Sequence, residues 1–307
     1  MFLDEHERLI LLHQRNNPLT QESLKNFAGV GVKTMRLCYY SPWHEIEPSP
    51  GRYSWDVIDR AIGEARGAGL KVLVELYDRA PFWLPGVLCP EAGTIFGADI
   101  VHGMPFLAMV HPFNTEAMKI EAEFLERACE RLTGPGVECR YGMPSGGERI
   151  LPPGLSYTER QVVDLVVGRQ RIFAKHSEGL GTAFHLYPAV TSISGGTPEY
   201  VGNEHLWACY DAMKVEFPDH TLNRLIYEYF TAGGIWDCRI EGVKTWVGAE
   251  YARNVVYAAT HFHPRNVWGL LMGHSPFREE PRQPTSQEYD NTAKAIEILE
   301  KSYEPWV

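Results

Sequence analysis

The feature of this sequence that most restricts its fold is an alternation of short apolar runs with helical stripes along nearly the whole chain. Some runs, such as KVLVEL at residues 71–76, are almost continuously apolar, which is typical of strands buried on both faces of a parallel sheet. Eight runs have the length and composition of strands, at residues 9–13, 34–40, 71–77, 137–142, 182–188, 223–230, 243–249 and 267–272.

Helical stripes fill the intervals between these runs. Trp55, Ile58, Ile62 and Ala65 repeat with the period of about 3.6 residues that marks one helix face, and Ser54 precedes them as an N-cap. This stripe should pack outside the sheet against the strands at 34–40 and 71–77. Further helices are expected at about 117–132, 156–176, 204–216, 250–262 and 286–302.

Two of these helices have residues at their start that can cap them. Asn114 precedes one helix, and the spacing of Ser156 and Glu159 matches a capping box at the start of another.

Eight strands with helices between them, and no break in composition, predict an α/β fold: a single-domain (β/α)8 TIM barrel over residues 1–307. The usual size of such a barrel is roughly 250 residues. A doubly wound open sheet is the alternative, since the segment between the sixth and seventh runs is short for a full helix. No GxGxxG follows a strand, which disfavours that alternative. The Gly- and Pro-rich loop at 81–112 exceeds ordinary connections, so we expect it to lie over the barrel mouth and to be functional.

Composition excludes several classes of partner. The formal net charge of −10 argues against nucleic acid, because phosphate binding needs a basic face. The start, MFLDEHERLILLHQ, has acids ahead of a short apolar run and does not resemble a signal peptide, and no apolar stretch approaches the roughly 20 residues of a membrane span. We therefore expect a cytoplasmic protein. Its cysteines, expected to be reduced and mostly buried, are Cys38, Cys89, Cys129, Cys139, Cys209 and Cys238.

The segment VECRYGMPSGGERILPP, residues 137–153, carries the strongest chemical signal. It predicts a short strand and then a turn that presents Glu148 between Gly147 and Arg149. The carboxyl end of a barrel strand is where such enzymes place catalytic acids, and glycine lets a substrate approach the backbone closely. The alternative is a solvated glutamate on a surface loop.

A resemblance to known families appears in the first 85 residues. The chain is similar there to clan A glycoside hydrolases, in particular family-42-type β-galactosidases, and also to β-amylases. The resemblance implies a TIM-barrel glycosidase of carbohydrate metabolism that acts on a carbohydrate and needs neither cofactor nor metal. The residues that carry it are Trp43, Glu47, Pro48, Gly51, Tyr53, Trp55, Asp59, Gly69, Leu70, Lys71 and Val72.

Around Glu148 the chain departs from clan A. Those enzymes usually carry Asn-Glu at the end of the fourth strand, whereas this chain has Gly147 before Glu148. GMPSGGERILPP is closer to the β-amylase pattern, in which the Glu is the general acid. The resemblance therefore implies that Glu148 is the proton donor, with Glu138 on the same strand as the alternative. It also favours an inverting reaction over a retaining one.

Glycoside hydrolysis needs a second carboxylate across the anomeric carbon. The resemblance places it at the end of the seventh strand, where Glu250 is the candidate nucleophile or base. Alternatively, Glu250 is a first-turn residue that complements a helix dipole. Glu228, inside LIYEYF, is the rival, because a lone Glu in an apolar strand must face a polar cavity or be paired.

Several further residues are candidates for substrate binding. Arg36 matches the arginine with which clan A enzymes orient the nucleophile, although an ion pair with an acid at the barrel rim would also explain it. Asp78 could bind sugar hydroxyls, and Tyr227 or Tyr229 could hydrogen-bond the second carboxylate. Aromatic rings suit the apolar faces of sugars, and the tryptophans at predicted strand ends are Trp43, Trp83, Trp246 and Trp268.

These patterns together predict a glycoside hydrolase acting on an oligosaccharide or glycoconjugate. The alternative is a catalytically inactive barrel that binds glycan, or an accessory protein of polysaccharide metabolism. His261 and His263 form an HxH pair, but its place after a helical stripe disfavours a metal site. The sequence does not specify the sugar, the linkage or the oligomeric state.

Overall fold

The architecture was taken from a computed structural model of the chain. The structure describes residues 9–14, 19–37, 43–76, 80–81, 83–84, 87–88, 109–110, 114–141, 158–180, 184–186, 203–222, 225–230, 267–274 and 283–302.

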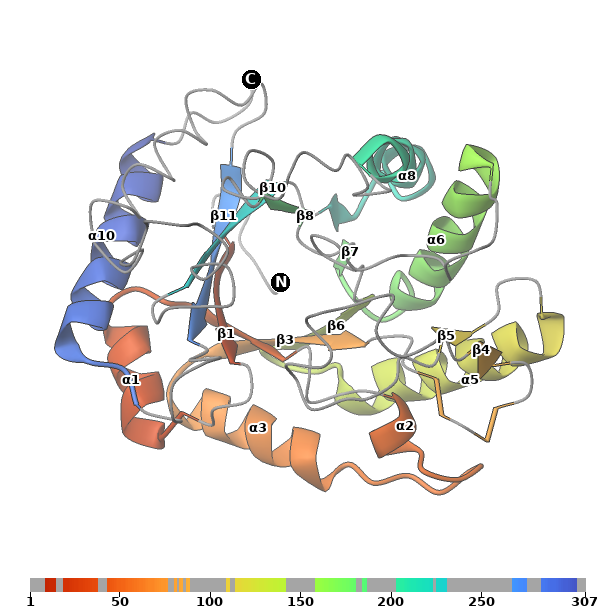
Figure 1. Ribbon diagram of the computed structural model, residues 1–307, viewed down its shortest axis with the longest axis horizontal. Helices are drawn as coiled ribbons and strands as arrows, with labels where there is room; N and C mark the ends of the chain where they lie inside the picture. Colours follow the sequence, from red (N-terminus) through yellow and green to blue (C-terminus); the bar gives the residue numbers. More distant parts are fainter. Residues whose placement is uncertain are drawn as a thin grey trace, which may run out of the picture.

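A sheet of seven parallel strands forms the centre of the molecule (Figure 1). The strands lie in the order β6, β3, β2, β1, β11, β10 and β8, so the first and last strands of the chain are neighbours. Their bounds are Leu9–Gln14 for β1, Thr34–Leu37 for β2, Lys71–Leu76 for β3, Val137–Tyr141 for β6, Phe184–Leu186 for β8, Leu225–Phe230 for β10 and Val267–His274 for β11. A parallel sheet in which the chain returns to its first strand agrees with the predicted fold class.

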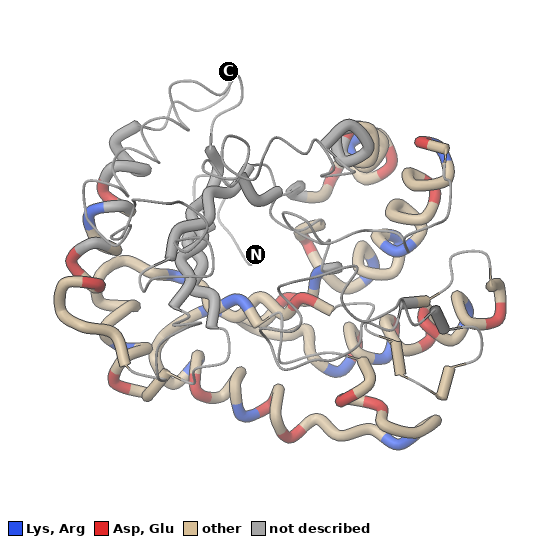
Figure 2. The backbone as a smooth tube through the Cα atoms, viewed as in Figure 1, with Lys and Arg blue, Asp and Glu red and all other residues tan. Residues whose placement is uncertain are grey.

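Helices surround the strands in Figure 1. They are α1 (Gln21–Gly29), α2 (Trp43–Ile46), α3 (Asp56–Gly67), α5 (Thr115–Leu132), α6 (Glu159–Phe173), α8 (Asn203–Glu216) and α10 (Ser286–Ser302). Acidic and basic residues are interspersed along them (Figure 2). Within the described residues, none of the helices has the length and hydropathy needed to span a bilayer.

The helix caps agree with the sequence in one case and differ in two. Asn114 caps α5 as predicted, because its side chain accepts from the Ala117 N–H. The capping box of α6 is formed by Thr158 and Gln161 rather than by the predicted pair two residues earlier. The N-cap of α3 is Trp55, one residue after the predicted Ser54, and its side chain makes no capping hydrogen bond.

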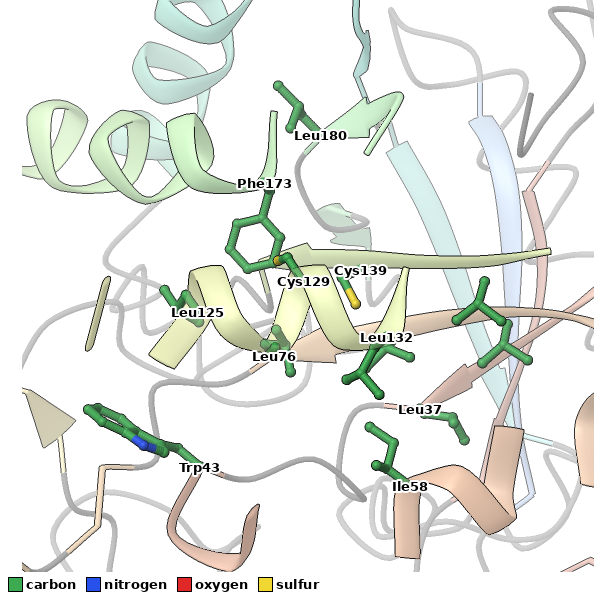
Figure 3. Packing of buried hydrophobic residues seen from close by; sticks show 14 of the residues in the cluster. Leu37, Trp43, Ile58, Leu76, Leu125, Cys129, Leu132, Cys139, Phe173 and Leu180 are labelled. Carbon is green, nitrogen blue, oxygen red and sulfur yellow. The ribbon is translucent and has the colours of Figure 1, made fainter. Parts of the chain in front are cut away.

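The apolar face of the sheet packs against the helices (Figure 3). Ile58 and Ala65 of α3 are buried in the same cluster as Met35 of β2 and Val72 of β3. Strands β2 and β3 are parallel neighbours, with Thr34 beside Lys71. The predicted parallel pairing of the two strands and the packing of the helix against β3 are confirmed.

The order of the last strands differs from the prediction. β10 pairs directly with β11, with Ile226 beside Gly269 and Phe230 beside Gly273. We expected a strand at 243–249 as the seventh, ahead of the last, but the described neighbour of the last strand is β10. Residues 243–249 and the predicted helix at 250–262 lie outside the described residues.

Two short pairings add to the central sheet. Strands β4 (Val87–Leu88) and β5 (Met109–Val110) are antiparallel and join the two arms of the long loop predicted at 81–112. Strands β7 (Gly179–Leu180) and β9 (Thr221–Leu222) are parallel and precede β8 and β10 in the chain. The two arms of the long loop are therefore joined by a short antiparallel strand pair.

The described cysteines are buried and free. Figure 3 shows Cys129 of α5 beside Cys139 of β6. The hydrogen bond with Cys139, together with burial, raises the pKa of the Cys129 thiol, and burial raises the pKa of Cys209 to about 12. Both thiols are therefore protonated near neutral pH.

We expect Cys129 and Cys209 to resist thiol reagents in the folded protein, because the thiolate is the reactive form. Modification at pH 8 should be at least about 10²-fold slower than in denaturant. Peptide mapping by mass spectrometry after a timed pulse of iodoacetamide measures each cysteine separately. Equal rates in folded and unfolded protein would contradict the buried environment of these thiols.

Candidate active site

The face of the sheet opposite the helices carries buried polar residues. Directly paired residues share a face of a sheet, and so do residues two apart along a strand. The pairing places Arg36 beside Leu73, Leu73 beside Glu138, and Glu75 beside Arg140. The members of this polar face on β2, β3 and β6 are each at most 2% exposed, and they are Thr34, Arg36, Leu73, Glu75, Glu138 and Arg140.

Arg36 and Glu75 form a buried ion pair on this face. Nη2 of Arg36 lies 2.6 Å from Oε2 of Glu75, and the two side chains are 1% and 0% exposed. Each residue stands one position before the carboxyl end of its strand. The ion pair expected as one explanation of Arg36 is thus present, and its partner is Glu75. The pair holds the positive charge of Arg36 near the carboxyl end of β2, which is the end of the strands where barrel enzymes carry out their chemistry.

A second buried pair connects β6 to β7. Nη2 of Arg140 donates to Oε2 of Glu138 at 2.8 Å, and the backbone N–H of Gly179 donates to Oε1 of Glu138 at 2.6 Å. A Cβ atom on Gly179 would lie 2.1 Å from Nη2 of Arg140, so only glycine fits beside the guanidinium. Glu138, the alternative proton donor, is 2% exposed and bound into this network, which indicates a structural role.

Strand register relates Glu228 of β10 to the positions of the polar face on β2. Glu228 lies beside Leu271, Leu271 beside Leu11, and Leu11 beside Thr34. Glu228 therefore occupies the same set of alternate positions as Thr34 and Arg36, two residues before the end of β10. Among the described strands, β10 is the one that pairs with β11 on the side away from β1, and Glu228 is the glutamate that it carries.

Tyr227 occupies the other set of alternate positions. It lies beside Leu270, which lies beside Ile10, and two residues further on β1 Leu12 lies beside Met35. Met35 belongs to the apolar face that packs against the helices. The alternation of the strand separates Tyr227 from Glu228. The predicted hydrogen bond from Tyr227 to a second carboxylate at Glu250 stays a prediction, because Glu250 lies outside the described residues.

Trp43 and Trp83 differ in exposure. Trp43 is 0% exposed, and its ring stacks on Phe124 at 4.8 Å between centroids. A side chain without exposed surface has no ring face to offer a sugar, so Trp43 is a core residue. Trp83 is partly exposed, so of these two tryptophans it is the one that stays a candidate for contact with a sugar.

Trp268 lies at the wrong end of its strand for the predicted role. It is the second residue of β11, beside a register irregularity between β10 and β11. Barrel active sites form at the carboxyl ends of parallel strands, and Trp268 is near the amino end. Its selection as a sugar platform was therefore a misplacement along the strand.

The buried hydrogen-bond network around the carboxylate of Glu47 was not predicted from the sequence. It is 4% exposed, and it accepts from Nε1 of Trp43 at 2.8 Å and from the Gly51 N–H at 2.7 Å. Burial, the charge of Glu47 and a hydrogen bond to it raise the pKa of the Tyr53 phenol. The spacing of these residues in the family motif was a signal for this network.

The remaining predicted site residues, Glu148, Glu250, Asp78 and Trp246, lie outside the described residues. What the described part supplies is a buried charged face with Arg36 and Glu75 near the strand ends, and the backbone position of Glu228 on the same face. Such an environment can orient a carboxylate and stabilise a charge that develops near it.

Comparison with known families supports the resemblance. The sequence model of glycoside hydrolase family 42, described as Beta-galactosidase, matches residues 12–85. This segment runs from β1 past β3 and includes Arg36, Glu47 and Glu75. The chain thus resembles clan A, family-42-type β-galactosidases. A search of curated proteins finds no match.

Solved structures of glycosidases share the fold at low sequence identity. The β-galactosidase of the psychrophilic Marinomonas ef1 superposes with a TM-score of 0.59 at 14% identity, over 94% of this chain and 59% of that one. A GH5_18 structure from Bifidobacterium longum subsp. longum, in complex with Manb1-4GlcNAc, gives a TM-score of 0.54 at 14% identity, over 90% of this chain and 72% of that one. A GH5_18 structure from Bifidobacterium longum subsp. infantis gives 0.53 at 12% identity, over 90% and 73%.

Proposed function

We propose that the chain is a single-domain (β/α)8 TIM-barrel glycoside hydrolase. It would use two carboxylates to cleave a glycosidic bond in an oligosaccharide or glycoconjugate. The observation that carries this proposal is the buried Arg36–Glu75 pair, 2.6 Å apart at the carboxyl ends of β2 and β3. It lies inside the segment that matches the β-galactosidase family.

In this proposal Glu148 protonates the leaving oxygen. It follows β6 by seven residues, and β6 is held by the Glu138–Arg140–Gly179 network. A proton donor must keep a fixed position relative to the bond that breaks. A strand anchored by buried charged hydrogen bonds gives the following turn a rigid starting point.

The second carboxylate is Glu250 or Glu228. Glu250 was selected on the expectation that a strand at 243–249 precedes the last strand. The direct pairing of β10 with β11, and the register that groups Glu228 with Arg36, favour Glu228. Arg36 would then orient this carboxylate, while Asp78, Trp83 and Trp246 bind the sugar. Hydrolysis by two carboxylates involves no cofactor or metal.

The first test is turnover by the unmodified protein. We expect hydrolysis of at least one substrate in a panel of nitrophenyl glycosides and natural oligosaccharides, measured by nitrophenol release and by product chromatography. Retention or inversion follows from the anomer that forms first in ¹H NMR. Carboxyls about 5–5.5 Å apart give retention, whereas about 6.5–9.5 Å gives inversion.

A lack of turnover across the panel would reject the enzyme. If glycan binding were intact in the same protein, by calorimetry with the same oligosaccharides, the non-catalytic glycan-binding barrel would be the correct alternative.

A further inference from the structure

Glu47 connects three segments that lie on the carboxyl side of the sheet. It follows α2 directly and precedes a turn in which Ser49 bridges Arg52. The turn contains Gly51 with φ +72°, a left-handed conformation that favours glycine. The buried carboxylate binds the Gly51 N–H and the indole N–H of Trp43, so it fixes the turn and α2 together.

The same residue also holds Trp83. Nε1 of Trp83 donates to the backbone carbonyl of Glu47 at 2.9 Å. The ring of Trp83 stands edge-on to Trp43, with centroids 6.1 Å apart and planes at 88°. The Glu47 carbonyl and the Trp43 ring, which both contact Trp83, therefore belong to residues that the Glu47 carboxylate holds in place.

The contacts determine which part of Trp83 can meet a ligand. Its one polar side-chain atom donates to the carbonyl of Glu47, so what the side chain can offer a ligand is the carbon surface of its ring. The residue as a whole is partly exposed. Trp83 follows the end of β3, and α2 follows the end of β2, so both leave the carboxyl edge of the parallel sheet on which Arg36 and Glu75 stand. An apolar ring at that edge is suited to the C–H face of a sugar.

We propose that Glu47 is a positioning residue that holds Trp83 as a stacking surface for a sugar unit away from the bond that is cleaved. The proposal depends on the glycosidase function argued above. Binding that is equally strong in the ground state and the transition state changes KM and leaves kcat unaltered. Loss of the platform should therefore matter only for substrates long enough to reach it.

The test compares Glu47→Gln and Trp83→Phe with the unmodified protein. The first variant replaces one acceptor oxygen by a donor, and the second keeps a ring but lacks the indole N–H. The substrates are the nitrophenyl monosaccharide that is cleaved fastest and the tetrasaccharide of the same sugar. Both variants should raise KM for the tetrasaccharide about 3- to 10-fold, and the rise in KM for the nitrophenyl monosaccharide should be clearly smaller.

A readout independent of turnover is the ¹⁵N indole spectrum. The Trp83 signal is assigned by its absence in Trp83→Phe. Adding the tetrasaccharide to the unmodified protein should shift this signal. In the absence of ligand, Glu47→Gln should shift the signals of both Trp43 and Trp83. Equal losses on both substrates, or unchanged KM, would overturn the positioning role. If the unmodified protein cleaves nothing, the glycosidase proposal fails, and a Trp83 signal unmoved by the tetrasaccharide would then reject the stacking role as well.

Discussion

Replacing Glu228 with glutamine is expected to lower kcat by about 10²- to 10⁴-fold, the range that a positioned catalytic carboxylate contributes. The reason is the strand order, since β10 is the neighbour of the last strand and Glu228 shares the polar face with Arg36. Glu250→Gln should change kcat by less than about tenfold if Glu250 only complements a helix dipole. Steady-state kinetics on the best nitrophenyl glycoside measures both variants.

Glu148→Gln serves as the matched variant for the proton donor. A nitrophenol leaves readily without a proton, whereas a sugar alcohol does not, so this variant should lose more activity on the oligosaccharide than on the nitrophenyl glycoside. Glu228→Gln should lose activity on both. A large loss in Glu250→Gln with full activity in Glu228→Gln would return the role to Glu250 and reject the inference from strand order.

The elements that the sequence predicted well are those set by local pattern. The run at 71–77 became β3 because five of its six described residues are buried, as continuous apolar composition requires. α5 begins after Asn114 because the side chain caps it. α1 was missed, although Thr20 caps it and Leu24 and Phe27 are buried on one face. A helix of nine residues gives too short a stripe to stand out.

The features that the sequence did not predict depend on tertiary pairing. Periodicity marks a strand but does not name its neighbour, so the adjacency of β10 and β11 had to come from the structure. In a strand that is buried on both faces, the sequence alone does not show which residues belong to which face. Tyr227 and Glu228 are adjacent in sequence, and only the register groups one with Arg36 and the other with Met35.

Aromatic residues present a related ambiguity. Trp43 and Trp83 each follow the end of a predicted strand, and from the sequence either could stack on a sugar or fill the core. The structure separates them by exposure, since Trp43 is 0% exposed and packs on Phe124. Trp43, Glu47 and Gly51 belong to the motif that carries the family resemblance. Through the hydrogen bonds of Glu47, these residues hold the segment between β2 and α3 in place.

Gly179→Ala is expected to lower the free energy of unfolding by about 1–3 kcal/mol, the usual cost of forcing extra atoms into a packed interior. The new Cβ would lie 2.1 Å from Nη2 and 2.6 Å from Cζ of Arg140. Arg140 is 1% exposed and its guanidinium donates to Glu138, so moving it aside would disturb the buried Arg140–Glu138 hydrogen bond. Urea titration followed by circular dichroism measures the change.

Gly168→Ala is the matched control, because it makes the same substitution where the outcome should have the opposite sign. Gly168 lies inside α6, and a Cβ there would meet nothing within 4 Å. Alanine loses less backbone entropy than glycine in a helix, so this variant should be more stable by about 0.5–1 kcal/mol. In the double variant Gly179→Ala with Arg140→Ala, the steric cost should vanish and the two effects should not add. Additive losses would show that the contact with Arg140 is not what requires glycine at this position. The anchoring of β6, the strand that precedes Glu148 in the sequence, would then need another origin.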